Sequence, residues 1–177
     1  MKHISVLTVL ILAALSTCSA FTPRWCQEPC EDNYCGPSTC MTWRDFSGHL
    51  VEDLDFGTCW FGYTYSQTIR IDHTNQQEQH CVCSIEIICP DDAPYYAICY
   101  DYPCDPYPSG FYNALDEFTI DTSGFPNIEV TFSPRSGYKG NREALLIMYY
   151  QLVEDPTCCW SAAVCLTGYA KPGLMLR

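Results

Sequence analysis

The chain has 177 residues, 47% of them hydrophobic and 14% aromatic, with 14 cysteines and a formal net charge of −12. Such an acidic balance argues against nucleic acids and anionic membrane surfaces as partners, because both repel negative charge. The length allows a real hydrophobic core, so the cysteines are expected to support a packed domain and not to replace one.

Residues 1–20, MKHISVLTVLILAALSTCSA, have the features of a secretory signal peptide. Lys2 opens a short basic start, an apolar run follows over 6–15, and small residues suit cleavage after Ala20. The apolar run is too short to span a bilayer, and no later run is long enough. The sequence therefore predicts a secreted, extracellular protein without a membrane span.

Thirteen cysteines remain once residues 1–20 are removed, because Cys18 lies in the cleaved segment. That is about one residue in twelve, a density that indicates a disulfide scaffold in an oxidising compartment. Since thirteen is odd, one thiol is free by parity or links two chains into a disulfide-bonded dimer. The cysteines expected to form disulfides, one of them unpaired, are Cys26, Cys30, Cys35, Cys40, Cys59, Cys81, Cys83, Cys89, Cys99, Cys104, Cys158, Cys159 and Cys165.

Residues 21–48 form a cysteine-rich N-terminal segment. Its stretch CQEPCEDNYCGPSTC holds four cysteines that are four to five residues apart, punctuated by proline, asparagine and glycine. This pattern is typical of a looped, stapled segment. The spacing is wider than in common zinc motifs and the compartment is oxidising, so disulfides are favoured over a metal.

Residues 49–153 carry the pattern of a β-sandwich. Short runs rich in β-branched and aromatic residues alternate with turn signals such as PDDAP and SGFPN, and no amphipathic helix of ten or more residues is evident. The sequence therefore predicts an all-β fold. The expected strands lie at 61–72, 81–89, 95–102, 117–122, 128–133 and 144–152.

Residues 154–177 form a cysteine-containing C-terminal tail. Adjacent Cys158 and Cys159 are expected to bond different partners, because a bridge between neighbours strains the peptide that joins them. Together with Cys165 they would tie the tail to the body or to the N-terminal segment. Residues 159–166 are compatible with one short strand or with one helical turn.

The stretch HCVCSIEII, residues 80–88, could hold a metal or a redox pair. In a strand, alternation places Cys81 and Cys83 on one face with Ile85, and His80 on the other. Side chains two residues apart on one face are about 6–7 Å apart, whereas a disulfide needs Cβ atoms about 3.5–4.5 Å apart. The two cysteines should therefore reach different neighbours. The histidine and the cysteines diverge, so no metal site is predicted here.

The stretch CWFGYTYSQTIRIDHTNQQEQHCVCSIEII, residues 59–88, resembles the first half of a CUB domain. In that family a cysteine beside an aromatic residue precedes an alternating strand, a polar turn, a second cysteine and another strand. Residues 115–150 resemble the family's closing strands, with Gly137-Tyr138 as its Gly-aromatic pair. The resemblance implies a CUB-like jelly-roll sandwich of two antiparallel sheets, here with disulfide-stapled N- and C-terminal extensions. It also implies a disulfide between Cys59 and Cys81.

The chain departs from the family at two points. Calcium-binding members carry an acidic residue shortly after the second cysteine, where this chain has Cys83-Ser84, so no calcium or other cofactor is predicted. Cys83, Cys89 and Cys104 exceed the family's usual four cysteines, while Cys99 can belong to its second pair.

Catalysis is not expected. The mature chain has three histidines, His49, His73 and His80, and none lies in a hydrolase or metalloprotease motif. Cysteine nucleophiles need a free thiolate beside a base, and no signature marks one. The sequence predicts a non-catalytic protein, with a secreted hydrolase as the minor alternative.

Two loops are candidate binding sites. SPRSGYKGN, residues 133–141, and the arginine that follows it gather Arg135, Tyr138, Lys139 and Arg142 in an otherwise acidic protein. Arginine and tyrosine are common binding anchors; the alternative is a hairpin turn whose cations offset the acidic body. The loop 100–112 offers the candidates Tyr107 and Tyr112, whose alternative role is packing beside the core.

Two functional hypotheses remain. The first is a secreted recognition module that binds an extracellular protein or glycan, as the CUB resemblance implies. The second is a cysteine-rich effector, such as a toxin, defence protein or hydrolase inhibitor, that uses the N-terminal cysteine cluster as its active face. The sequence leaves the ligand and the disulfide connectivity open.

Overall fold

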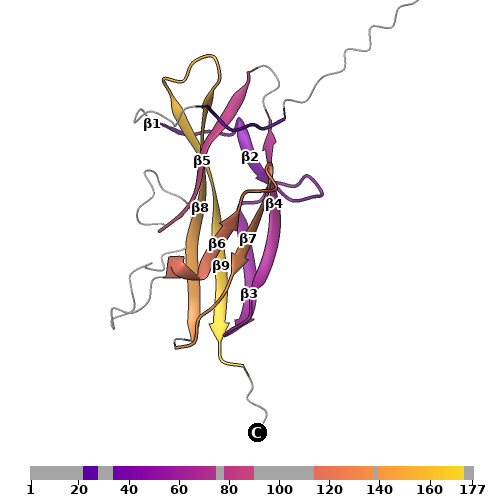
Figure 1. Cartoon of the computed structure of the whole chain (residues 1–177), viewed down its shortest axis with the longest axis vertical. Coiled ribbons are helices and arrows are strands. Elements are labelled where there is room, and N and C mark those ends of the chain that lie inside the picture. The colour runs from indigo at the N-terminus through magenta and orange to yellow at the C-terminus, as the bar shows by residue number, and fades with distance from the viewer. Residues whose placement is uncertain (1–21, 28–33, 75–77, 90–113, 138, 174–177) are drawn as a thin grey trace, which may run out of the picture.

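Two β-sheets pack face to face in this computed structural model, which describes residues 22–27, 34–74, 78–89, 114–137 and 139–173 (Figure 1). Sheet A has the order β1–β9–β8–β5, with β3 also paired to β9, and sheet B has the order β2–β4–β7–β6. The predicted all-β sandwich is confirmed. No helix in the described ranges is long and apolar enough to cross a membrane. The elements are β1 (Tyr34–Pro37), β2 (Met41–Arg44), β3 (Asp53–Trp60), β4 (Tyr65–His73), β5 (His80–Ile88), the 3₁₀ helix η2 (Ala114–Glu117), β6 (Phe118–Asp121), β7 (Asn127–Phe132), β8 (Gly140–Leu152) and β9 (Cys159–Lys171).

The strands β8 and β9 form the centre of sheet A. They pair antiparallel from Gly140 and Ala170 at one end to Gln151 and Cys159 at the other, and 13 residues span about 40 Å in a strand. The second edge of β9 is shared by β1 near its start and β3 near its end, and both run parallel to it. Sheet A is therefore mixed, because the two N-terminal strands β1 and β3 run parallel to β9 along one of its edges. The CUB resemblance implies antiparallel sheets instead.

The sandwich extends beyond the predicted residues 49–153. The segment 21–48 contributes β1 to sheet A and β2 to sheet B, and the segment 154–177 contributes the long strand β9. Residues 159–166, for which strand and helical turn were both open, are strand. Most other predicted strands coincide with observed ones, and residues 95–102 lie outside the described residues.

The core lies between the two sheets. Trp43 of β2 is almost fully buried, and its indole Nε1 donates a hydrogen bond to the carbonyl of Ala162 in β9, at 3.0 Å. Phe132 of β7 is fully buried and stacks on Phe118 of β6 with ring centroids 4.7 Å apart. Gly168 of β9 faces the Phe132 ring, where even a methyl group would collide. These contacts fix the two sheets against each other along their length.

The strand β5 contains a β-bulge. Val82 pairs with Tyr150 and Ser84 with Tyr149, so Cys83 is the extra residue. A bulge shifts the alternation by one residue, and Ile85 therefore packs against the core cluster that also contains Val82. The prediction that Cys81 and Cys83 share a face with Ile85 is wrong for this reason.

The outer edge of β5 is covered by the N-terminal segment. Trp25 forms a parallel bridge with Val82, with backbone hydrogen bonds of 2.8 Å from Cys26 N to Val82 O and from Val82 N to Arg24 O. The Trp25 ring also contacts Phe125, with centroids 4.6 Å apart. Pairing of this kind hides edge groups that would otherwise template association with another chain.

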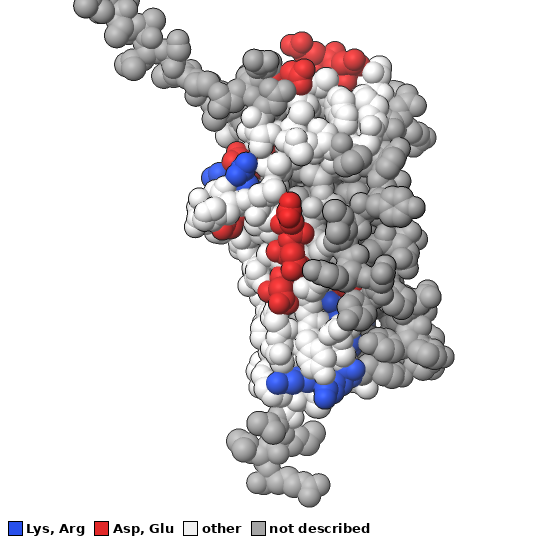
Figure 2. Space-filling view, turned by 180° about the vertical axis from the view of Figure 1, so that it is seen from behind, with Lys and Arg blue, Asp and Glu red and all other residues white. Residues whose placement is uncertain are grey.

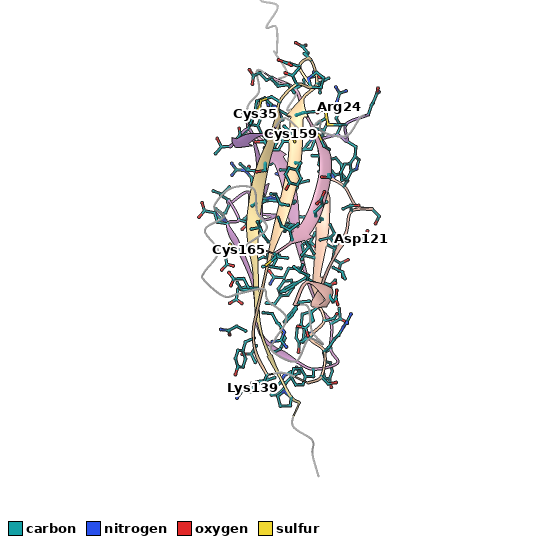
Figure 3. All side chains as sticks on the ribbon, turned by 90° about the vertical axis from the view of Figure 1, so that its left-hand side faces the viewer. Arg24, Cys35, Asp121, Lys139, Cys159 and Cys165 are labelled. Atoms are coloured by element: carbon teal, nitrogen blue, oxygen red, sulfur yellow. A yellow bond between two sulfur atoms is a disulfide. The ribbon has the colours of Figure 1, made fainter. Side chains whose placement is uncertain are left out.

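Disulfides staple both ends of the chain, as predicted. Cys26 bonds Cys81 and Cys35 bonds Cys158, and Cys35 lies beside Cys159 at the upper end of the molecule (Figure 3). Adjacent Cys158 and Cys159 do not bond each other, and Cys81 and Cys83 do not either. Cys83, Cys159 and Cys165 are also disulfide-bonded.

The pairing of Cys59 with Cys81 is wrong. Cys81 is bonded to Cys26, and Cys59 is buried in the core with its thiol donating to the carbonyl of Phe56 at 3.2 Å. Cys40, Cys59 and Cys89 are all free in the described ranges, so the expectation of a single unpaired thiol is also wrong. Parity requires only an odd number of unpaired thiols, and one is the smallest such number. Cys30, Cys99 and Cys104 lie outside the described residues.

Candidate functional site

The predicted basic loop, residues 133–142, connects β7 to β8 at the lower end of the sandwich. Two hydrogen bonds tie it to the β3–β4 turn. Gly62 N donates to the carbonyl of Pro134 at 3.1 Å, and the hydroxyls of Thr64 and Ser133 are 3.0 Å apart. The loop and the turn therefore form one continuous surface.

Arg142 is buried and not available to a ligand, which corrects its prediction as a binding residue. Its Nε lies 2.5 Å from Oε2 of Glu117, and the two side chains are 1% and 0% exposed. Its Nη1 donates to the carbonyls of Gly140 and Asn141 at 3.3 and 3.2 Å. A cation that begins a core-facing strand beside the acidic η2 forms a buried ion pair, and such a pair anchors a loop.

Arg135 remains at the surface with its side chain 58% exposed. Its backbone N–H donates to Oε1 of Glu117 at 2.8 Å, and its Nη2 donates to the carbonyl of Asp116 at 3.3 Å. Nη1 lies 3.8 Å from the Asp116 carboxylate. An exposed ion pair of this kind contributes little stability, so the guanidinium can exchange this partner for a ligand at small cost.

A groove of about 750 Å³ opens beside Arg135, and we call it the end groove. Its walls come from the β3–β4 turn, the start of the 133–142 loop, η2 and β6. The aromatic ring of Tyr63, which is 65% exposed, stands at its rim. The lining residues are Phe61, Gly62, Tyr63, Thr64, Asp116, Thr119, Ser133, Pro134, Arg135 and Ser136.

A second aromatic and cationic pair lies at the same end of the sandwich. The ammonium of Lys171 sits 4.1 Å from the centroid of the Trp60 ring, a cation–π contact. Figure 2 shows lysine and arginine gathered at this lower end, with an acidic stripe further up, a second basic group beside that stripe and an acidic cluster at the top. Lys171 and Arg135 add positive charge at the end where the end groove lies.

The other predicted binding residues are placed only in part. Lys139 is exposed and lies at the lower tip of the molecule (Figure 3). Tyr138, Tyr107 and Tyr112 lie outside the described residues. Sequence reasoning missed Tyr63, because its strand-like alternation with Phe61 and Tyr65 favoured a core position.

The chemistry of the end groove suits binding. Its lining holds hydroxyls, one carboxylate, one guanidinium and aromatic rings, and includes no histidine or cysteine. Aromatic and arginine side chains beside hydroxyls are common anchors of recognition surfaces.

A different cluster occupies the upper end, between the sheets. Cys40 precedes β2, His80 begins β5, and Glu78 lies two residues before it. One ligand atom from each of these three residues lies within 4.8 Å of the other two. The cluster is assembled because Cys40 accepts a backbone hydrogen bond from Thr74 N, at 2.9 Å, just where β4 ends and the chain crosses towards β5.

His80 is held firmly at the centre of this cluster. It is 4% exposed, and its Nδ1 lies 2.9 Å from Nε2 of His73, the last residue of β4. The rings of Tyr150 and Trp160 meet it edge-on, with centroids at 5.6 and 5.9 Å. Burial first, and the charge of His73 second, lower the pKa of His80, while Glu78 opposes this shift. The neutral imidazole is therefore favoured.

Local sequence could not reveal this cluster. His80 does lie on the opposite face from Cys81, as predicted, but its sulfur neighbour is Cys40, which lies just before β2 of the other sheet. The 40-residue separation carries no spacing signal of the kind that marks zinc motifs.

The N-terminal cysteine segment is the active face in the effector hypothesis. Disulfides join it to sheet A at two places. Its Cys26 is bonded to Cys81 of β5 and its Cys35 to Cys158, beside β9. Residues 28–33 lie outside the described residues.

No family model matches the chain, and no curated protein matches it in sequence. Among solved structures, it is similar to the ASH / PapD-like domain of human CEP192 (PapD-like domain 7), with a TM-score of 0.44 and 14% identity over 77% of this chain and 89% of that one. It is also similar to part of an endo-fucoidan hydrolase of glycoside hydrolase family 107, with a TM-score of 0.38 and 9% identity over 70% of this chain and 13% of that one.

Proposed function

We propose that the protein is a secreted, non-catalytic recognition module whose end groove binds an extracellular protein or glycan. The observation that carries the proposal is the end groove itself, an open groove of about 750 Å³ that presents Tyr63 and Arg135 together. Ligand pockets typically have volumes of about 300–1,000 Å³ and combine apolar walls with a few placed polar groups.

The groove is rigidly supported, which favours binding. The buried Glu117 carboxylate takes both the backbone N–H of Arg135 and the guanidinium of Arg142. A ligand therefore meets a loop that is already ordered and loses less conformational entropy on binding. Tyr63 adds a broad apolar surface with few rotatable bonds.

Secretion agrees with the covalent architecture. Disulfides tie Cys26 to Cys81 and Cys35 to Cys158, and such bonds persist in oxidising compartments. The predicted signal peptide would direct the chain there. Resemblance to CUB domains agrees with a recognition role, although the disulfide that it implies is absent.

The test is a binding screen of the purified mature chain against a glycan array and a panel of extracellular proteins. Tyr63→Ala and Arg135→Ala are each expected to lower the affinity for the ligand found in the screen at least tenfold. Central aromatic and arginine anchors contribute about 1–3 kcal/mol or more to binding. Binding is quantified by titration calorimetry.

Two matched controls isolate the groove. Phe46 is a similarly exposed aromatic residue, at 69%, and Arg70 is a partly exposed arginine paired with Asp72, as Arg135 is with Asp116. Neither lines the end groove. Phe46→Ala and Arg70→Ala should therefore leave affinity within about twofold. Equal losses in the groove and control variants would refute the assignment of the site.

A further inference from the structure

The cluster of Cys40, Glu78 and His80 combines three kinds of ligand atom: a thiolate sulfur, a carboxylate oxygen and an imidazole nitrogen. Zinc accepts all three, whereas calcium and magnesium take oxygen ligands almost exclusively. Cys40 is not in a disulfide, although seven other cysteines of the described residues are bonded. A free thiol beside a buried histidine in a disulfide-rich chain calls for a chemical role.

We propose that Cys40, Glu78 and His80 bind a zinc ion at the upper end of the sandwich, with His73 as a positioning residue and a water in the fourth place. This site lies at the opposite end of the molecule from the end groove, because β4 runs from Tyr65 beside the groove to His73 beside the cluster. The inference is therefore independent of the proposed function.

The geometry needs only small adjustments. Sulfur, nitrogen and oxygen atoms around a tetrahedral zinc lie about 3.3–3.6 Å apart, given bond lengths of about 2.0–2.3 Å. The three ligand atoms already lie within 4.8 Å of one another, so rotation of the exposed Glu78 side chain and a small shift of Cys40 would close the site. His80 itself is held in place by Tyr150 and Trp160.

His73 is placed to hold the ring of the ligand His80 in position. A ligating histidine usually engages a hydrogen-bond partner through its second ring nitrogen, which fixes the ring and its tautomer. Nδ1 of His80 is engaged in this way by Nε2 of His73 at 2.9 Å, which leaves Nε2 of His80 for the metal.

The experiment uses the oxidised mature chain, freed of metal by dialysis against a chelator. Zinc affinity is measured by competition with a chromophoric chelator, and Co²⁺ is added as a spectroscopic substitute. We expect one equivalent of zinc to bind, with a thiolate-to-cobalt charge-transfer band and the visible bands of tetrahedral cobalt. Zinc should also protect Cys40 from alkylation.

Variants separate ligands from their surroundings. Cys40→Ser should abolish the charge-transfer band, and His80→Gln should lower zinc affinity at least 100-fold. His73→Gln should lower it about 10–100-fold while leaving the band in place, as expected of an outer partner. His49→Gln and Cys89→Ala change an exposed histidine and another free cysteine, and both should bind zinc as the natural chain does.

Three results would overturn the proposal. The first is peptide mapping that finds Cys40 in a disulfide in the purified chain. The second is less than one equivalent of zinc bound by the natural chain at micromolar concentrations. The third is a charge-transfer band that persists in Cys40→Ser. The band reports sulfur ligation directly. Circular dichroism first confirms that the Cys40→Ser chain is folded, so that loss of the band cannot be caused by unfolding.

Discussion

Replacing Gly168 with alanine should force Phe132 out of its place in the core. The added Cβ would lie 2.6 Å from Cε1 of Phe132, 3.0 Å from Cδ1 and 3.3 Å from Cζ. Carbon atoms in contact prefer about 3.5–4.0 Å, so the ring would have to move by about 1 Å. Phe132 is fully buried and is held between Phe118, at 4.7 Å, and Phe56, at 5.7 Å.

The cost follows from two opposing effects. Overpacking of a dense core costs about 1–3 kcal/mol. Alanine recovers about 0.5–1 kcal/mol because glycine loses more backbone entropy on folding. Overpacking is the larger of the two, so Gly168→Ala should destabilise the fold by about 1–2 kcal/mol. For a chain of this size, that corresponds to a fall in Tm of about 2–8 °C.

A double-mutant cycle in urea tests whether Phe132 is the cause. Phe132→Leu alone should cost about 1–2 kcal/mol through the space that it leaves. In the Gly168→Ala background the same change should cost little, because the smaller side chain makes room for the methyl group. The coupling free energy should therefore reach about 1 kcal/mol.

Gly173 provides the matched control, since it is exposed and a Cβ there meets nothing within 4 Å. Gly173→Ala should change stability by less than about 0.5 kcal/mol. The reasoning is refuted if Gly168→Ala is neutral, or if the costs of Gly168→Ala and Phe132→Leu simply add.

Three further predictions concern buried polar groups. Arg142→Met should lower the free energy of unfolding in urea by about 3–5 kcal/mol, because it leaves the Glu117 carboxylate buried without its cation. Adding Glu117→Gln should restore a large part of that lost free energy. A loss below about 1 kcal/mol for Arg142→Met alone would contradict the role of the pair. Burial raises the pKa of the Cys59 thiol to about 11, with Asp55 adding to the shift. Cys59 should therefore resist iodoacetamide at pH 8 in the folded chain and react once the chain is unfolded. Rapid labelling of Cys59 in the folded chain would contradict its burial. The folded-state pKa of His80 is lowered, so below about pH 6.5 the unfolded chain binds more protons than the folded chain. The free energy of unfolding should therefore be at its full value above that pH and fall as the pH is lowered. In the metal-free chain, His80→Gln should flatten this dependence of stability on pH, and an unchanged dependence would assign it to other groups.

The strands that sequence predicted well are those whose structure is set locally. The β7 sequence NIEVTF alternates buried positions with partly or fully exposed ones, as a strand with one face on a core must. β3 was missed because its sequence DLDFGTCW contains a glycine and two aspartates. It is strand because it pairs with β9, more than a hundred residues further along the chain. No window of sequence contains that partner, which is also why residues 159–166 could not be assigned.

The cysteines and histidines show the same limit more sharply. Spacing rules compare side chains on one strand, and on β5 they correctly separated His80 from Cys81. They assume unbroken alternation, which the bulge at Cys83 interrupts. They also cannot see a ligand supplied by another strand. Cys40 reaches His80 only because Met41 pairs with His73 and the chain then crosses from sheet B to sheet A. A strand register that joins residues more than thirty apart, followed by a crossover, therefore brings together three potential ligands that neither stretch of sequence contains alone.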